Sequence, residues 1–385
     1  MPPFDMGLVQ RGARLRRSPF YEAEQRHSPR GYTVYNHMLF PTNYLDFEAE
    51  YWHLLNHVTL WDVAVERCLE VSGRDGLRFA QLMTPRDLSA CAVGQAKYVL
   101  ICAPDGGILN DPVLTRMGEN RFWFALASSD VLFYAKGLAA RAGLDVELSE
   151  ADVHPLQIQG PKARDVVRAL FGEEILELKY YFFRETQVDG IPVVVTRTGW
   201  TSEIGYEVYL LDPSRGTALW EKILAAGAPY NIRPTGPSDI RRIEGGIFNW
   251  GADMTYEHNP FELGLERLVD CDMKGECVAL DALRRIRDRG VNRRIAGIEL
   301  DGDPFPALNF TKWPAQVRGQ QVGPVTSAIY SPRLKKNIGY CWLPSELAVP
   351  GTSVTVTSEW GRRAATVTAM PFVDPLKRIP VLGAA

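Results

Sequence analysis

Short β-prone runs separated by turns constrain the fold of this chain more than any other feature of its sequence. Between Ala96 and Ala127, three apolar runs are broken by the turns Pro104-Asp-Gly-Gly107 and Gly118-Glu-Asn120. This spacing predicts a meander of antiparallel strands. The segment 185–211 predicts a second hairpin of the same kind.

The last part of the chain contains only strand and turn signals. Ser353-Val-Thr-Val-Thr357 alternates polar and apolar residues, a turn follows around Trp360, and Ala365-Thr-Val-Thr368 alternates again. This pattern is typical of a small β-barrel. Helices are predicted elsewhere, over 75–83, 129–142, 218–226 and the first half of 239–252. The chain is therefore expected to have an α+β fold with a C-terminal β-barrel.

Length, composition and charge exclude several classes of protein. The 385 residues suit two or three subdomains better than one core, and 46% hydrophobic with 23% charged residues is an ordinary globular composition. A formal net charge of -3 provides no basic field for a nucleic-acid backbone, so no nucleic-acid partner is expected. We find no apolar run long enough to span a bilayer and no signal-peptide core, so we expect a cytoplasmic protein without a membrane partner.

The motifs of the common cofactors are absent from the sequence. There is no G-x-G-x-x-G after a strand, no P-loop, no H-E-x-x-H and no G-x-S-x-G elbow. The six cysteines form no C-x-x-C pair, so no metal site is expected. What remains is a set of polar residues within apolar, β-rich stretches. They are Tyr98, Asn110, Asp111, Trp200, Glu207, Tyr209, Arg242 and Glu244.

Two carboxylates in this set are the strongest candidates for function. Asp111 and Glu207 each lie in a strand-like apolar run. A carboxylate in such a place must be hydrogen-bonded or functional, because removing a charge from water is costly. The alternatives are a strand-end carboxylate beside Pro112 and an outward-facing residue of a half-exposed strand. The residues alone leave both interpretations open.

Eight motifs of this chain resemble, in order and spacing, those of the aminomethyltransferase (T-protein) family, over roughly Tyr32 to the C-terminus. They are Leu60-Trp-Asp-Val63, Leu156-Gln-Ile-Gln-Gly-Pro-Lys-Ala163, Arg197-Thr-Gly-Trp-Thr201, Gly205-Tyr-Glu-Val208, Arg242-Ile-Glu-Gly-Gly246, Gly251-Ala-Asp253, Asn259-Pro-Phe-Glu-Leu-Gly-Leu265 and Gly323-Pro-Val-Thr-Ser-Ala-Ile-Tyr-Ser-Pro332. Single motifs are weak signals, whereas eight in the right order are strong.

Four further segments are similar to the tetrahydrofolate-dependent demethylases of this family, which include enzymes acting on dimethylsulfoniopropionate. They are Tyr32-Thr-Val-Tyr-Asn-His-Met38, Trp61-Asp-Val-Ala-Val-Glu-Arg67, Leu82-Met-Thr-Pro-Arg-Asp-Leu88 and Leu109-Asn-Asp-Pro112. True T-proteins usually have Asp-Val-Ser-His-Met where this chain has Asp62-Val-Ala-Val-Glu66. The departure points away from glycine cleavage.

The resemblance implies a three-lobed ring around a central folate channel. The expected parts are an N-terminal extension over 1–31, a folate-binding α+β core over 32–62 and 150–285, an inserted α+β lobe over 63–149, and a C-terminal β-barrel over 290–385. The implied cofactor is tetrahydrofolate, with Glu207 receiving the N–H and amino groups of the pterin and Asp111 near the reacting nitrogen. Further implied cofactor contacts are Tyr98, Trp200, Tyr209 and Arg242.

The reaction implied is transfer of a methyl group from a small methylated organic acid to N5 of tetrahydrofolate, giving 5-methyltetrahydrofolate. Asp111 is the candidate to take the proton that N5 must shed. A sulfonium donor such as dimethylsulfoniopropionate would leave as a neutral thioether and favour an aromatic cage, for which Trp200, Trp250 and Tyr256 are candidates.

A methoxylated aromatic acid would instead leave as a phenolate and require an acid. His37 and His258 are the candidates, each with a structural role as its alternative. The bulky aromatic groups in Ile247-Phe-Asn-Trp250 and Thr255-Tyr-Glu-His258 tilt the expectation toward this second donor. Two other functions stay open, an aminomethyltransferase of glycine cleavage and a non-catalytic folate-binding regulatory protein. We expect a monomer or homodimer.

Overall fold

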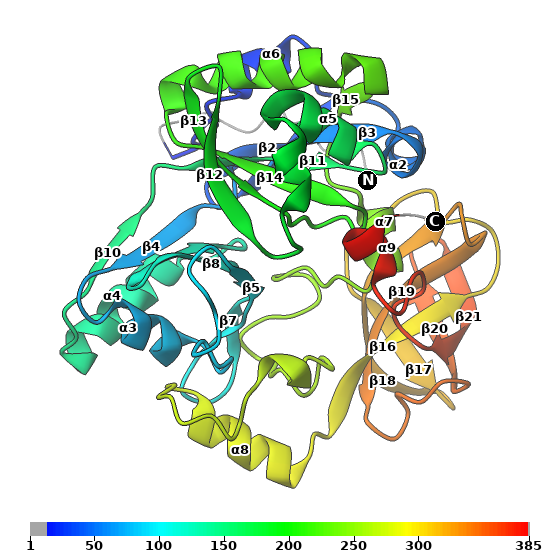
Figure 1. Cartoon of the computed structure of the whole chain (residues 1–385). Coiled ribbons are helices and arrows are strands. Elements are labelled where there is room, and N and C mark those ends of the chain that lie inside the picture. The colour runs from blue at the N-terminus through cyan, green and yellow to red at the C-terminus, as the bar shows by residue number, and fades with distance from the viewer. Residues whose placement is uncertain (1–13, 384–385) are drawn as a thin grey trace.

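The computed structural model describes residues 14–383, which form three lobes around a common centre (Figure 1). Helix α1 (Tyr21–Gln25) already belongs to the core, because Phe20 and Ala23 are 0% exposed and the Phe20 ring lies 6.3 Å from that of Trp220. The expected extension over 1–31 is therefore wrong for its last part, where the chain is packed. Residues 1–13 lie outside the described part.

The core lobe is a six-stranded sheet in the order β12-β13-β14-β11-β3-β15, with β15 parallel to β3 and the other neighbours antiparallel. Every residue of β14 and β3 is buried, as expected of central strands. Helices α5 and α6 contribute apolar side chains to the same core. The elements are α2 (Phe47–Asn56), β3 (Val58–Asp62), β11 (His154–Gln159), α5 (Ala163–Phe171), β12 (Phe183–Val188), β13 (Ile191–Thr196), β14 (Gly205–Leu210), α6 (Gly216–Gly227) and β15 (Ile232–Pro234).

The second lobe follows β3 and precedes β11, so it is an insertion into the core sheet. Its five-stranded antiparallel sheet has the order β10-β4-β9-β8-β5, and the predicted meander is confirmed. Its elements are β4 (Cys68–Ser72), α3 (Gly76–Met83), β5 (Ala96–Tyr98), β6 (Ile101–Cys102), β7 (Ile108–Asn110), β8 (Val113–Gly118), β9 (Arg121–Ala125), α4 (Val131–Ala142) and β10 (Glu147–Glu150).

The third lobe is a closed six-stranded barrel in the order β16-β19-β18-β17-β20-β21, as the alternating pattern predicts. Its elements are β16 (Arg293–Leu300), β17 (Trp313–Val317), β18 (Gln320–Ser331), β19 (Lys336–Pro344), β20 (Ser353–Ser358) and β21 (Gly361–Thr368). The segments between the core sheet and the barrel carry α7 (Asp239–Glu244) and α8 (Leu280–Arg289), and α9 (Arg378–Leu382) follows the barrel. Within the described residues, no helix is long and apolar enough to cross a membrane.

A hairpin of β1 (Gly31–Tyr35) and β2 (Met38–Asn43) connects the core to the inserted lobe. The Nδ2 group of Asn36, at its turn, donates to the carbonyl oxygens of Val65 at 2.9 Å and Leu126 at 3.1 Å. These bonds fix the hairpin against the point where the chain leaves the core sheet and enters the inserted lobe.

Candidate active site

Asp111 is held by a tyrosine at the edge of the inserted lobe. It follows β7, and the hydroxyl of Tyr98, the last residue of β5, donates to its Oδ2 atom at 2.9 Å. Burial raises the pKa of Asp111 from its ordinary value of 3.8 to about 7, although the Tyr98 hydrogen bond opposes that rise. Near neutral pH this carboxyl group can therefore both take up and release a proton.

Glu207 lies in the middle of β14 with a 3% exposed side chain. Its Oε2 atom accepts hydrogen bonds from the hydroxyls of Thr198 at 2.7 Å, Tyr209 at 3.0 Å and Thr196 at 3.3 Å. Burial raises the pKa of Glu207, and these donors lower it. They explain how a carboxylate is tolerated in a central strand.

The other oxygen of Glu207 is less occupied. Oε1 accepts one described hydrogen bond, from Nε2 of Gln157 at 2.7 Å, and Oε1 of Gln157 is itself buried without a hydrogen-bond partner among the described residues. Two neighbouring acceptors therefore retain lone pairs. A buried acceptor without a donor is costly, so this pair suits a ligand edge that carries several N–H groups.

Glu66 joins these two carboxylates, because the segments that carry Glu66 and Asp111 are bonded to the same short stretch of chain after β9. The backbone N–H of Leu126 donates to the carbonyl of Arg67 at 3.1 Å. The side chain of Asn110 donates to the carbonyl of Ala127 at 3.0 Å and accepts from its N–H at 3.0 Å. Glu66 and Asp111 therefore lie just beyond the end of the sheet face on which Cys68 and Ala125 are paired, and the charge of Asp111 contributes to the raised pKa of Glu66.

This face of the inserted lobe packs against the core sheet. Cys68 and Ala125 contact Tyr209 of β14, and the Tyr209 ring lies 6.2 Å from that of Trp123. Glu207, two residues before Tyr209, therefore lies opposite the end of the face that carries Glu66 and Asp111. We call these three residues, Glu66, Asp111 and Glu207, the carboxylate cluster.

Electrostatics support this arrangement. Burial, followed by the negative charges of Glu207 and Asp111, holds the pKa of Glu66 well above its ordinary value. Glu66 and Asp111 are nevertheless only half-buried. Both carboxyl groups are therefore strongly desolvated by the protein and still in contact with solvent.

Aromatic residues surround the cluster, in part as expected. Tyr98 and Tyr209 bond directly to its carboxylates. Tyr181 is half-buried, and burial followed by its neighbours Tyr180 and Glu207 raises its pKa. Trp200 packs with Trp61 on the core sheet, so its place in a channel wall stays a prediction.

Arg242 has a different role from the predicted contact with the cofactor. Its Nε atom donates to Asp239 at 2.6 Å, Nη1 to Asp253 at 2.8 Å and Nη2 to Ser327 at 2.9 Å. All three nitrogen atoms are thus engaged in joining α7 to the barrel. We correct the assignment: Arg242 is a buried structural ion pair and its guanidinium group faces protein acceptors.

The two histidines do not accompany Asp111. His37 is exposed at the β1–β2 turn, and its Nε2 atom lies 3.3 Å from Asp130. His258 is stacked 4.2 Å from the Trp342 ring, and its Nδ1 atom accepts from the backbone N–H of Thr255 at 3.0 Å. Burial and then Arg293 lower its pKa, so His258 is uncharged at neutral pH. Neither imidazole matches the predicted acid.

The predicted donor cage is also dispersed. Tyr256 is 64% exposed, so its ring does not wall an enclosed site. Trp250 is half-buried, and its Nε1 group donates to the carbonyl of Ile108 at 3.3 Å, beside the strand that leads to Asp111. Of Trp250 and Tyr256, only Trp250 therefore stays a candidate for contact with the donor.

The site contains residues that the sequence did not identify as functional, namely Glu66, Gln157, Thr196 and Thr198. Gln157 alternates with Gln159 in an otherwise apolar strand, which is a signal that could have been used. Glu66 stands in a motif that departs from true T-proteins, but only the fold brings it near Asp111.

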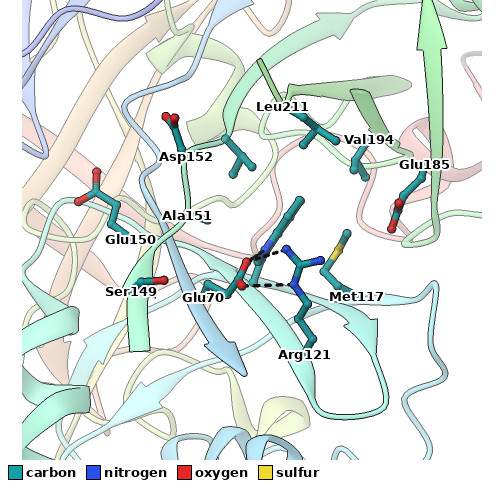
Figure 2. A pocket seen from close by; sticks show the side chains of 12 residues that line it. Glu70, Met117, Arg121, Ser149, Glu150, Ala151, Asp152, Glu185, Val194 and Leu211 are labelled. Atoms are coloured by element: carbon teal, nitrogen blue, oxygen red, sulfur yellow. Dashed lines mark hydrogen bonds and ion pairs between the residues drawn. The ribbon is translucent and has the colours of Figure 1, made fainter. Parts of the chain in front are cut away.

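A separate groove of about 380 Å³ opens at the other end of the seam between the two sheets. Arg121 and Glu70 line it, and Nη2 of Arg121 donates to Oε2 of Glu70 at 2.9 Å (Figure 2). Trp123 lines this groove and contacts Tyr209, so these two rings stand between the groove and Glu207. None of the residues predicted to bind folate lines it, and we do not assign the reaction to it.

Comparisons with known proteins identify the family of this chain. Residues 20–273 match the model of the GCVT N-terminal domain, and residues 293–374 match that of the glycine cleavage T-protein C-terminal barrel domain. The chain is 37% identical over 362 residues to dimethylsulfoniopropionate demethylase DmdA of Ruegeria pomeroyi, covering 94% of this chain and 98% of the relative. It is 29% identical to an aminomethyltransferase of Caldanaerobacter subterraneus subsp. tengcongensis, covering 89% and 91%.

Among solved structures, the glycine cleavage system aminomethyltransferase T of Bartonella henselae has the same fold. The TM-score is 0.83 at 25% sequence identity, and the match covers 93% of this chain and 98% of that one. The chain therefore belongs to the glycine cleavage T-protein family of tetrahydrofolate-dependent enzymes.

Proposed function

We propose that this chain is a tetrahydrofolate-dependent demethylase whose donor is a small sulfonium carboxylic acid of the dimethylsulfoniopropionate type. The structural observations that support it most are Asp111, a carboxyl group with a pKa of about 7 held by Tyr98, and the acceptor pair of Glu207 and Gln157. The 37% identity to a dimethylsulfoniopropionate demethylase over nearly the whole chain supports the choice of donor.

The residues fit tetrahydrofolate. Glu207 Oε1 and Gln157 Oε1 are adjacent acceptors that match the N–H and amino groups along one edge of the pterin. When bound, tetrahydrofolate supplies N5, the nucleophile that accepts the methyl group. The chain itself holds the two reactants in line, and such alignment can contribute on the order of 7–11 kcal/mol.

Asp111 completes the proton balance of the transfer. The bond from sulfur to methyl carbon breaks, its electron pair stays on sulfur, and a bond from N5 to that carbon forms. N5 then carries a positive charge, and Asp111 in its ionised form takes the N5 proton. The products are a neutral thioether acid and 5-methyltetrahydrofolate, so the sulfonium needs no acid to leave.

A methoxylated aromatic acid fits less well. Its phenolate needs a proton donor, and both candidate histidines lie outside the carboxylate cluster, one at the hairpin turn and one on Trp342. Asp111 would then have to protonate the leaving oxygen and also accept the proton of N5. One carboxyl group serves both tasks less readily than it serves the single proton removal of the sulfonium reaction.

The test is direct assay of the purified chain under anaerobic conditions. Dimethylsulfoniopropionate, methoxybenzoates and the components of glycine cleavage are supplied separately with tetrahydrofolate, and 5-methyltetrahydrofolate and thioether are measured by mass spectrometry. Equal amounts of both products from the sulfonium alone are expected. Methylated folate from the ethers only would reject the sulfonium, and no methylated folate from any donor would favour the aminomethyltransferase or regulatory alternative.

A further inference from the structure

Glu66 is an acidic side chain that the protein leaves without a cation. Among residues 14–383, its carboxylate has no ion pair or side-chain hydrogen bond. The adjacent Arg67 is committed elsewhere, because its Nε donates to Glu150 at 2.8 Å and its guanidinium group also lies 4.0 Å from Asp130. The carboxyl group of Glu66 is therefore available to a ligand.

The other members of the carboxylate cluster already accept hydrogen bonds from protein groups. Glu207 accepts four hydrogen bonds from protein groups, and Asp111 accepts one from Tyr98. Three acidic side chains thus face one site, and a positive charge placed among them would relieve their mutual repulsion. Of the three, Glu66 is the one that no protein donor orients.

An aromatic residue lies at this corner of the site. Tyr35, at the end of β1, is half-buried and directly precedes Asn36, which bonds to Val65, the neighbour of Glu66, at 2.9 Å and to Ser128 at 3.2 Å. Burial, followed by the charges of Glu66 and Asp111, raises the pKa of Tyr35, in agreement with this placement. The Phe40 ring lies 6.0 Å from the Tyr35 ring, and the Asn36 bonds to Val65 and Leu126 hold the hairpin in place. A carboxylate beside an aromatic ring is the combination that binds onium groups.

We propose that Glu66 recognises the positively charged sulfur of the methyl donor and thereby makes the chain selective for onium compounds over neutral methyl donors. This inference rests on the proposed function. An onium group has no N–H or O–H to donate, so charge and ring contact are its only strong means of recognition. A carboxylate without protein donors, beside Tyr35, provides both.

Binding should also be coupled to a proton. In the free protein, repulsion within the cluster keeps a proton on it, and an arriving cation favours the ionised form, so the donor releases a proton. The titratable groups that face Glu66 are Asp111, Glu207, Tyr35, Cys68 and Tyr209. Affinity for an onium donor is therefore expected to rise with pH.

The experiment compares dimethylsulfoniopropionate with 4-methylpentanoate, an isostere in which an uncharged carbon replaces the positive sulfur and the carboxylate is kept. Both are titrated calorimetrically into the chain saturated with folic acid, whose oxidised ring lacks a nucleophilic N5. We expect about tenfold or greater preference for the sulfonium in the wild type and less than about threefold in Glu66→Gln. Titrations in buffers of different ionisation enthalpy should show proton release that Glu66→Gln abolishes.

Two further variants separate recognition from general effects. Glu185→Gln removes the same charge from an exposed residue of the outer groove and should keep the preference. Glu66→Asp retracts the carboxylate by one methylene and should keep part of the preference for the sulfonium. This variant tests the inference even if Glu66→Gln folds poorly. A preference that survives in Glu66→Gln, or a wild type that binds the isostere equally well or binds neither ligand, would overturn the proposal.

The experiments distinguish a failure of this inference from a failure of the proposed function. If the wild type methylates tetrahydrofolate from a methoxybenzoate but does not prefer the sulfonium, folate-dependent demethylation stands and the role of Glu66 is rejected. If no donor yields 5-methyltetrahydrofolate while the sulfonium preference depends on Glu66, the recognition stands and the catalytic proposal is rejected.

Discussion

Removing the hydroxyl of Tyr98 should move the pH dependence of methyl transfer upward. That hydroxyl donates to Asp111 at 2.9 Å. The pKa of Asp111, about 7, results from burial, which raises it, and from this hydrogen bond, which lowers it. A hydrogen bond to a charged group contributes about 1.5–3 kcal/mol, and 1.36 kcal/mol corresponds to one pKa unit. Because water replaces part of the lost bond, we expect Tyr98→Phe to raise the pKa by roughly one unit.

The sign of the effect follows from the role of Asp111 as a base. The ionised form is active, so the single-turnover rate in the wild type should rise with pH, with its midpoint near 7, and then level off. In Tyr98→Phe the midpoint should lie near pH 8, which reduces the rate at pH 7 about fivefold and leaves the rate at pH 9.5 almost unchanged.

The assay is rapid-quench measurement of methyl transfer at saturating tetrahydrofolate and donor, from pH 5.5 to 9.5. Asp111→Asn is the reference, and it should lose the inflection and about 10²–10⁴-fold in rate, with a smaller effect on folate affinity. An unchanged or lower midpoint in Tyr98→Phe, or a midpoint near 7 retained in Asp111→Asn, would refute the assignment of Asp111 as the base.

Three other changes test the binding site and the fold. Glu207→Ala should weaken tetrahydrofolate at least tenfold by calorimetry, because each hydrogen bond to its charge contributes about 1.5–3 kcal/mol; equal affinity would remove Glu207 from the site. Burial and Asp62 hold the pKa of Glu24 well above 4.5 in the folded chain. The unfolded chain releases that proton, so the free energy of unfolding should fall by about 1.4 kcal/mol per pH unit above 4.5. In Glu24→Gln the slope measured by urea unfolding at pH 6–8 should be smaller by this amount, and equal slopes would contradict the interpretation. Asp253→Ala should cost about 3–5 kcal/mol in the same assay, because it removes one of the two carboxylates that pair with the buried Arg242; a loss below 1 kcal/mol would show that this ion pair is dispensable.

Local sequence patterns predicted most of the elements but not where the folded chain begins. The alternation over 353–368 became β20 and β21, and the helices expected over 75–83, 129–142 and 218–226 correspond to α3, α4 and α6. The segment before Tyr32 was predicted to be an unpacked extension, because α1 is too short for a periodic pattern. Phe20 is buried only because α6, almost two hundred residues later, covers it.

The polar residues of the site show where sequence reasoning stops. Asp111, Glu207 and Arg242 gave the same signal, a charged group in an apolar stretch, and the cost of burial requires only that such a group be satisfied. Arg242 is satisfied by three protein side chains, whereas Gln157 beside Glu207 retains an acceptor without a donor. That difference separates a structural residue from a binding residue, and it depends on partners that are distant in sequence.

Glu66 is a site residue that its neighbours in the sequence do not reveal. It is separated from Asp111 by 45 positions and from Glu207 by 141, and its two neighbours along the chain are Val65 and Arg67. Arg67 predicts a local ion pair, yet in the fold its guanidinium group bonds to Glu150. The positive charge that neighbours Glu66 in the sequence is therefore neutralised by another residue. The chain thus builds an uncompensated negative site from a charge pair that is balanced in the sequence, and a cationic donor is the partner that would balance it in the fold.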